Sequence, residues 1–278
     1  MAVGRATVNN MAGSQYRNSQ RVAPYLAASE RASWDRDGFF VVERFISQPR
    51  LSPLIERIQQ IAEIAEVGGD IGDAMLTREL ILANEPTPAG RISKVFKLHR
   101  REPLFNALAT DTRLLSRVAA LIGDNVDCFL SQFIFKHPGA LGQPWHQDSF
   151  YFRMHPEPQI GAWLAVTEAR IDNGPLWVVP GSHREPIHES VVRDLRAHAD
   201  PFYVEITGAD TSTEIPVLMN PGDLLVFHSH LRHRSTDNHS HDDRASMVLH
   251  YAQQGTTGFI APNHDWMPVV RSGDTATE

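Results

Sequence analysis

A histidine and an aspartate stand two positions apart, at His146 and Asp148, in a stretch whose residue pattern favours a β-strand. Side chains two apart on a strand project from the same face, with α-carbons roughly 6–7 Å apart. A neutral imidazole and a carboxylate on one face can together bind a divalent cation. The chain has 14 histidines, however, so a hydrogen-bonded surface pair is the default interpretation of this feature alone.

A third ligand could come from a later apolar strand that ends in a histidine-rich segment. The turn at Pro221 and Gly222 leads into this strand, and His228, His230 and His233 follow. Two histidines and one carboxylate on one face of an iron ion leave positions open for a chelating co-substrate and dioxygen, as in non-haem Fe(II) oxygenases. Spacing alone does not select among the three histidines. A structural zinc site is disfavoured, because such sites use four Cys or His ligands and the chain has one cysteine.

An arginine opens another predicted strand after this segment. Arg244 precedes β-forming residues up to Tyr251, and a strand returning beside the ligand-bearing strand could direct its guanidinium into the same cavity. A guanidinium suits a dicarboxylate because its planar fork donates two hydrogen bonds to one carboxylate. The alternative is an ordinary solvent-exposed arginine at a strand end, and Arg244 alone does not separate the two.

The elements that would position these residues indicate a mainly β domain with flanking helices. Helices are predicted from Ser47, as N-cap, to about Val67, and over residues 103–109 and 112–122. Turns rich in Gly, Pro and Asn separate many short strands, which indicates a β-sandwich or barrel. The predicted strands cover residues 92–98, 126–136, 145–152, 160–168, 176–179, 214–219, 223–228 and 244–251.

The predicted organisation is a flexible extension over residues 1–31, one domain over 32–270 and a frayed tail over 271–278. The extension is basic and rich in Ser, Asn and Ala, as in mitochondrial transit peptides, but a flexible extension is favoured. Residues 70–90 and 184–213 form longer irregular segments that we expect to shape a pocket.

Bulk composition narrows the class of protein. Lys plus Arg is 26 against Asp plus Glu 33, a formal net charge of −7 without a dense basic stretch, so a nucleic-acid partner is not expected. No window approaches the ~18 apolar residues that a membrane span needs. Cys128 lies in an apolar context and is predicted to be a core residue in a reducing compartment. We expect a cytoplasmic protein, monomeric or homodimeric, without a nucleic-acid or membrane partner.

In order and spacing, the motifs resemble the phytanoyl-CoA dioxygenase family of Fe(II)- and 2-oxoglutarate-dependent oxygenases, over roughly residues 34–266. The resemblance is carried by DGFFVV (37–42), FIFKHPG (133–139), WHQD (145–148), NGPL (173–176), VPGSH (179–183) and the run over 222–244.

The resemblance implies a double-stranded β-helix core, of the jelly-roll or cupin type, and it selects one histidine. Iron would be bound by His146, Asp148 and His233, since the family's distal ligand stands two positions before the serine and eleven before the arginine. By the same matching, Ser235 and Arg244 would bind the distal carboxylate of 2-oxoglutarate.

Further residues follow from the same matching, as what the resemblance implies. Lys94 would help to bind the co-substrate, Trp163 would pack against it, and Gln132 would project into the same cavity. His228 then becomes a supporting or core histidine, and His230 is expected at the rim.

The implied activity is oxidation of a small molecule by dioxygen, with 2-oxoglutarate converted to succinate and CO2. Asp148 favours hydroxylation or desaturation over halogenation, because related halogenases have a small residue there. Family members act on acyl-CoA thioesters, compatible solutes and secondary metabolites, which leaves the substrate open. One alternative is a cupin-like metalloenzyme without 2-oxoglutarate, which would not need Arg244, Ser235 and Lys94. Another is a catalytically silent binding protein, which would be expected to lack a metal ligand.

Overall fold

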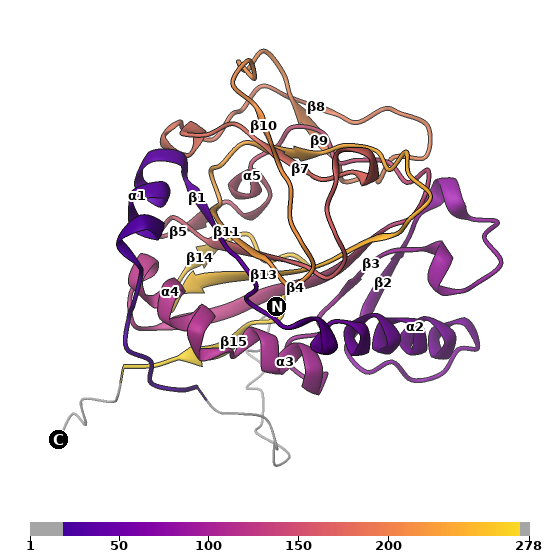
Figure 1. Cartoon of the computed structure of the whole chain (residues 1–278), viewed down its shortest axis with the longest axis horizontal. Helices are drawn as coiled ribbons and strands as arrows, with labels where there is room; N and C mark the ends of the chain where they lie inside the picture. Colours follow the sequence, from indigo (N-terminus) through magenta and orange to yellow (C-terminus); the bar gives the residue numbers. More distant parts are fainter. Residues whose placement is uncertain (1–18, 273–278) are drawn as a thin grey trace, which may run out of the picture.

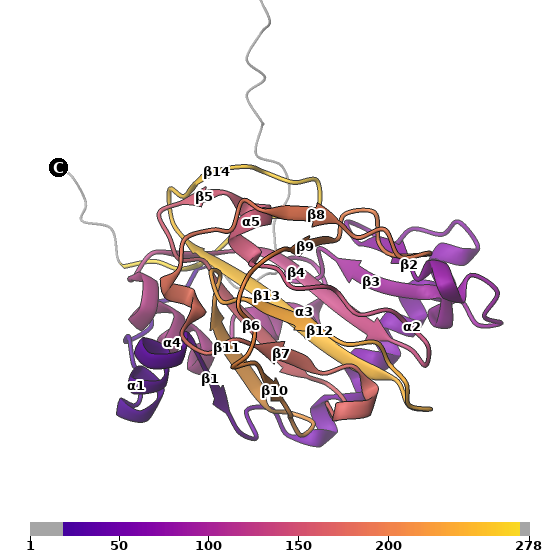
Figure 2. The same ribbon diagram turned by 90° about the horizontal axis from the view of Figure 1, so that it is seen from above.

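An eight-stranded antiparallel sheet forms the centre of the computed structural model, which describes residues 19–272 (Figures 1 and 2). In order across the sheet, the strands are β1 (Phe39–Val42), β11 (Leu224–His228), β6 (Ile160–Ala165), β13 (Arg244–Gln253), β4 (Val126–Lys136), β3 (Ile92–Phe96) and β2 (Met75–Arg78). The eighth strand, β15 (Met267–Val270), lies off this path and pairs with β4.

Three smaller antiparallel sheets complete the β-structure of the described residues. The three-stranded sheet consists of β10 (Ile215–Val217), β7 (Leu176–Val178) and β12 (His233–Ser235). Two-stranded sheets pair β14 (Thr257–Gly258) with β5 (Met154–His155), and β8 (Val191–Arg193) with β9 (Val204–Ile206).

The helices lie mainly on one face of the large sheet (Figure 1). They are α1 (Ala28–Asp37), α2 (Ser52–Glu66), α3 (Pro103–Ala109), α4 (Thr112–Ile122) and the short α5 (Asp148–Phe152), with 3-10 turns at Gln48–Arg50, Leu80–Leu82, Ala89–Arg91, Ile171–Asn173 and Ser182–Arg184.

Alternate residues of the central strand β13 face two different layers, as the period of a strand requires. Met247 and Tyr251 pack into the larger apolar core together with residues of α2, α3 and α4, among them Ile58 and Phe105. Val248 faces the other way and packs with residues of the three-stranded sheet. The face of β13 that carries the even-numbered residues is therefore enclosed between two sheets.

Several predicted elements have the predicted bounds, and one helix does not. The helices over 103–109 and 112–122 and the strand over 126–136 are confirmed as α3, α4 and β4. The helix predicted from Ser47 to about Val67 is confirmed as α2, but its predicted start is wrong, because a 3-10 turn precedes α2 and Ser47 makes no side-chain capping bond. Pro53 lies in the first turn of α2, where its missing N–H costs nothing, and this position sets the start of the helix.

The N-terminal extension predicted over 1–31 differs from the structure in its boundary. Residues 1–18 lie outside the described residues, but Gln20 forms a bridge with Val270, and α1 begins at Ala28. The tail predicted from residue 271 lies outside the described residues from 273 onwards, while Arg271 donates to the Val126 carbonyl at 2.8 Å.

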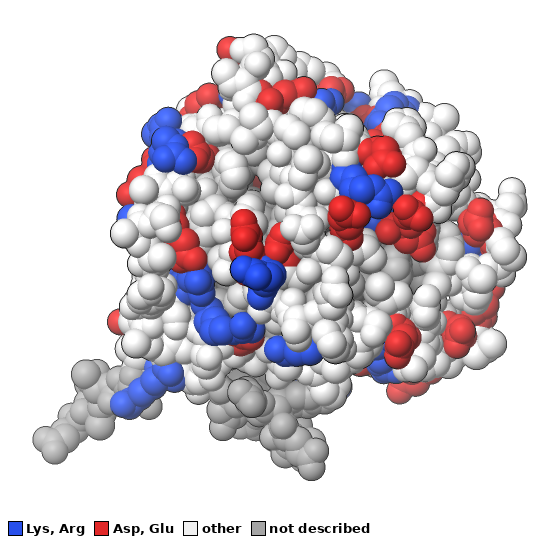
Figure 3. Space-filling view, in the orientation of Figure 1, with Lys and Arg blue, Asp and Glu red and all other residues white. Residues whose placement is uncertain are grey.

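Charged side chains of both signs are mixed over the face shown in Figure 3. Many of them form exposed ion pairs, such as Arg113 with Asp111 and Arg170 with Asp172. Within residues 19–272, no helix combines the length and apolarity needed to span a membrane.

Candidate metal centre

His146 and His233 are joined through their backbones, although they are far apart in sequence. The N–H of His146 donates to the His233 carbonyl at 2.9 Å, and the His233 N–H donates back at 3.0 Å. Each ring is also oriented, because the two Nδ1 atoms lie 2.7 Å from the Pro144 carbonyl and 2.9 Å from the Leu231 carbonyl. Both Nε2 atoms are thereby left for a shared ligand.

Asp148 completes the cluster from a helix rather than from a strand. The strand predicted over 145–152 is wrong, since Asp148 is the first residue of α5. Ser149 fixes this turn by donating its N–H to the Ser229 carbonyl at 3.0 Å and its hydroxyl to the Ser229 hydroxyl at 2.8 Å. Gln147 turns away and receives the His188 N–H at 2.8 Å. Contacts distant in sequence therefore override the local strand pattern.

The three side chains meet in a buried, compact donor set. Oδ1 of Asp148 lies 3.7 Å from Nε2 of both His146 and His233, and the three candidate ligand atoms all lie within 4.8 Å of one another. Burial, with His233 beside it, lowers the pKa of His146 to about 3. Burial by itself raises the pKa of Asp148, but the neighbouring imidazoles outweigh it and hold that pKa below its usual range. Neutral imidazoles and a carboxylate fit Fe(II).

The other carboxylate oxygen of Asp148 has a partner that the sequence did not reveal. Oδ2 lies 2.9 Å from Nε2 of His250, a side chain that is 2 % exposed. His250 stands six positions after Arg244 on the same strand, so the strand period places both side chains on one face. That period was the available signal.

Arg244 is a buried cation, not the solvent-exposed residue of the alternative interpretation. Its side chain is 2 % exposed, Nη1 donates to the Ser246 hydroxyl at 2.9 Å, and the guanidinium lies 5.5 Å from the centre of the Trp163 ring. Burial lowers the pKa of Arg244 to about 10. Its Nε has no hydrogen-bond partner, and within residues 19–272 no carboxylate forms an ion pair with it. A buried cation in this state fits an anionic ligand.

Ser235 is connected to a second buried cation, Lys136. Its hydroxyl accepts from Lys136 Nζ at 2.8 Å and from the Gln143 N–H at 3.0 Å. Lys136 is directly opposite Arg244 in the β4–β13 register. Burial and then the nearby Arg244 lower the pKa of Lys136 well below its ordinary value. Lys136 belongs to the FIFKHPG motif, but no role was predicted for it.

Lys94 and Gln132 lie on neighbouring strands of the same wall. Lys94 is opposite Ile134, and its Nζ lies 3.2 Å from the Asp200 carboxylate and 4.5 Å from the Tyr203 ring centre. Burial alone would lower the pKa of Lys94, but Tyr203 and Asp200 outweigh it and raise that pKa. Gln132 is half-buried on β4, two residues from Ile134 and therefore on the same face.

The two remaining histidine candidates lie outside the cluster. His228 packs between the rings of Trp34 and His183, with ring centres 5.6 Å and 5.4 Å away. His230 places Nε2 2.9 Å from the Glu157 carboxylate. Neither belongs to the group of three buried ligands.

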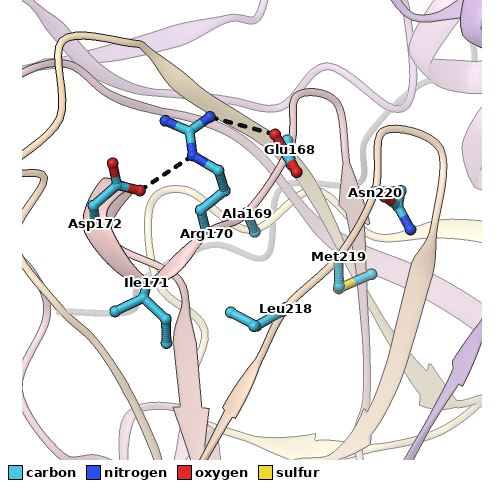
Figure 4. Close-up of a pocket in the computed structure, with 8 residues that line it drawn as sticks. All are labelled: Glu168, Ala169, Arg170, Ile171, Asp172, Leu218, Met219 and Asn220. Carbon is cyan, nitrogen blue, oxygen red and sulfur yellow. Dashed lines mark hydrogen bonds and ion pairs between the residues drawn. The ribbon is translucent and has the colours of Figure 1, made fainter.

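A surface hollow of about 420 Å³ lies elsewhere, between Glu168, Arg170 and Asp172 on one side and Leu218 and Asn220 on the other (Figure 4). Arg170 pairs there with both acidic residues. Its lining contains no histidine or cysteine, so this hollow offers no comparable ligand set.

Sequence comparison relates the chain to a known family. Residues 34–246 match the profile of the family described as phytanoyl-CoA dioxygenase (PhyH). The chain is 32 % identical over 175 residues to phytanoyl-CoA dioxygenase 1 of Oryza sativa subsp. japonica, an alignment that covers 61 % of this chain and 59 % of the rice protein. The chain thus spans about three fifths of that relative's length.

Solved structures share the fold at low sequence identity. The non-heme monooxygenase ThoJ, in its apo form, has a TM-score of 0.67 at 18 % identity, covering 87 % of this chain and 84 % of that one. The epimerase SnoN, in complex with Fe3+, alpha ketoglutarate and nogalamycin RO, has a TM-score of 0.62 at 16 % identity, covering 88 % and 95 %. These likenesses confirm the predicted double-stranded β-helix fold.

Proposed function

Because the chain belongs to the phytanoyl-CoA dioxygenase family, we propose that it is an Fe(II)- and 2-oxoglutarate-dependent oxygenase that hydroxylates a small molecule. One observation carries the proposal. The buried cluster of His146, Asp148 and His233 contacts His250, which lies on the same strand face as Arg244, and Arg244 is a buried cation that lacks an anionic partner within the described residues. Metal ligands and a carboxylate anchor together are what a chelating dicarboxylate co-substrate requires.

Each residue of the centre has a distinct task in this proposal. Iron bound by His146, Asp148 and His233 would supply oxidation by dioxygen, coupled to conversion of 2-oxoglutarate into succinate and CO2. The carbonyl partners of the two Nδ1 atoms hold the imidazoles in the orientation that the metal needs. Arg244 and Ser235 bind the distal carboxylate, since a planar guanidinium and a hydroxyl can both donate to it.

Residues 184–213, called the covering segment below, exclude solvent from this centre. Figure 2 shows its strands β8 and β9 beside α5. The Ile206 N–H donates to the Trp145 carbonyl at 2.8 Å, and the Val204 N–H donates to the Tyr151 hydroxyl at 3.2 Å. The segment that was expected to shape the pocket thus contacts Trp145 and Tyr151, the residues that flank His146 and Asp148 in the sequence. Exclusion of water strengthens electrostatic interactions inside the site.

Two alternatives are less well supported. A cupin-like metalloenzyme without 2-oxoglutarate would leave Arg244 buried without a carboxylate to bind. A catalytically silent binding protein would have no need for a complete set of three buried ligands.

Asp148 favours hydroxylation or desaturation over halogenation. The substrate class, the cytoplasmic location and the monomeric or homodimeric state stay predictions.

An anaerobic titration tests the proposal. Protein loaded with Fe(II) should develop the visible absorbance band of an iron–2-oxoglutarate chelate when 2-oxoglutarate is added. Protein that demonstrably holds Fe(II) but develops no band would contradict it. A screen for substrate-stimulated succinate formation, with acyl-CoA thioesters, amino-acid-like solutes and secondary metabolites, would then identify the substrate class.

A further inference from the structure

We propose that His250 is a positioning residue that allows Asp148 to bind the metal through one oxygen only. The inference rests on the proposed function and concerns how that metal centre is kept open. Oδ1 of Asp148 lies between the imidazoles of His146 and His233, at 3.7 Å from each Nε2, whereas Oδ2 lies 2.9 Å from His250 Nε2. The two carboxylate oxygens therefore have separate partners.

This division matters because the co-substrate needs coordination positions. A carboxylate that binds with both oxygens occupies two positions on the metal. With two histidines and one carboxylate oxygen, the remaining positions are open for a chelating co-substrate and dioxygen. By retaining Oδ2, His250 prevents Asp148 from occupying a position that the reaction requires.

The surroundings of His250 determine which of its nitrogens carries the proton. Among residues 19–272, no group forms a hydrogen bond with the buried Nδ1, so a proton there would be an unsatisfied donor. The tautomer with its proton on Nε2 avoids that cost, and Nε2–H donates to Oδ2 of Asp148. The ring therefore donates from Nε2 to the Asp148 carboxylate, because Nδ1 has no acceptor among the described residues.

Aromatic side chains hold the His250 ring in place. The centres of the Phe152, Phe129 and Phe227 rings lie 5.1 Å, 6.0 Å and 6.3 Å from it. Phe227 can approach only because Gly161 is opposite it, since a Cβ on Gly161 would lie 2.2 Å from the Phe227 ring. A fixed ring loses little entropy when it donates a hydrogen bond.

A β-bulge makes this arrangement possible. In the pairing of β13 with β4, His250 is opposite Leu130 but Tyr251 is opposite Cys128, which leaves Phe129 as the extra residue. Bulges redirect side chains and occur next to active sites. Here the bulge brings Phe129 against His250, and Trp266 stacks on Phe129 with ring centres 5.1 Å apart.

The test compares variants that keep or remove the donor. His250→Phe fills the aromatic surroundings but cannot donate, and His250→Gln places an N–H at a similar reach. His264→Phe is the matched control, because His264 packs against the same Phe129 and Phe152 rings without touching Asp148. The readouts are the Fe(II) dissociation constant, from anaerobic competition with a chelator, the visible spectrum of the Co(II)-substituted protein, and the unfolding temperature of the metal-free protein.

His250→Phe should bind Fe(II) about 10–100-fold more weakly, as expected when the hydrogen-bond partner of a ligand is lost. Its Co(II) bands should lose intensity as Asp148 binds through both oxygens, while its unfolding temperature stays near that of the wild type. His250→Gln and His264→Phe should behave like the wild type. If His250→Phe does not fold, His250→Leu removes the same donor.

Wild-type metal affinity and Co(II) spectrum in His250→Phe would overturn the inference, as would equal losses in folded His250→Phe and His264→Phe. A folded His250→Gln as weak as His250→Phe would overturn it too. These outcomes are distinct from failure of the proposed function, in which the wild-type protein itself would hold Fe(II) without forming the 2-oxoglutarate band.

Discussion

The ammonium of Lys94 lies 3.2 Å from the carboxylate of Asp200, which belongs to the covering segment. A residue expected to bind the co-substrate therefore already has an anionic partner. Asp200 and a carboxylate of 2-oxoglutarate would compete for the same cation, so the covering segment and the co-substrate are coupled through Lys94.

Asp200→Asn should accordingly strengthen 2-oxoglutarate binding. Partly exposed ion pairs contribute roughly 0.2–1 kcal/mol, so the co-substrate concentration that half-saturates the Fe(II) protein should fall about 1.5–5-fold. Titration of the chelate band measures it. Asp194→Asn is the control, because Asp194 pairs with Arg196 within the same segment. Weaker binding in Asp200→Asn alone would mean that Asp200 orients Lys94 for the co-substrate rather than competing with it.

Replacing Arg244 by methionine should separate co-substrate binding from metal binding. Loss of one partner of a buried charge pair costs roughly 2–5 kcal/mol, so half-saturation by 2-oxoglutarate should require at least about 30-fold more of it. Fe(II) affinity should not change, because Arg244 contacts Ser246 and Trp163 rather than the ligands. The half-buried Arg170, which pairs with Asp172 at the surface, provides the control Arg170→Met. An unchanged 2-oxoglutarate requirement in Arg244→Met would contradict the assigned role.

Two neighbouring histidines offer a matched test of the ligand set. His233→Ala should abolish tight Fe(II) binding, because it removes one of three buried ligands. His230→Ala should retain it, because His230 faces Glu157 instead. Equilibrium dialysis against Fe(II) under anaerobic conditions compares the two variants. Equal losses in both would leave the choice of His233 unsupported.

The bounds of some helices could be predicted from the residues at their ends. Pro103 and the Asp111 cap start α3 and α4, and Gly123 ends α4, so these bounds could be predicted from the sequence. The position of Asp148 could not, because its helical turn depends on Ser229, which lies 80 residues beyond Ser149. The family resemblance nevertheless selected His146, Asp148 and His233, the three side chains that form the buried cluster.

The residues that were missed depend on pairing rather than on composition. Lys136 lies opposite Arg244 only because β4 and β13 are neighbours in this register. His250 reaches Asp148 only because a bulge and a short helix bring the two together. The strand period places His250 on the face of Arg244, but neither its contact with Asp148 nor the pairing of Lys136 with Arg244 can be read from one strand.

Acid should destabilise the metal-free protein, in part through His228. Burial, and then His230 and His183, lower the pKa of His228 to about 3 from an ordinary value of 6.5. As the pH falls, His228 therefore becomes protonated at a higher pH in the unfolded chain than in the folded protein. The stabilising contribution is complete above pH 6.5 and declines towards pH 3.

His228→Asn should make the free energy of unfolding less dependent on pH over this window, because the amide oxygen can still accept the His230 N–H that His228 Nδ1 accepts at 2.9 Å. Urea unfolding at about pH 6.5 and about pH 4.5, in the presence of a chelator, measures the difference. The exposed His241 supplies the control His241→Asn, which should keep the wild-type dependence. An unchanged dependence in His228→Asn would show that other groups dominate acid unfolding.

The reciprocal backbone bonds between His146 and His233 have a kinetic consequence. Opening of the covering segment can admit a small molecule, but it does not separate two histidines that are tied main chain to main chain. Separation of the two main chains therefore requires the junction between β12 and the residues before α5 to open as a cooperative unit. Amide hydrogen exchange at these two positions should thus follow the opening of this junction, not the rate of substrate entry.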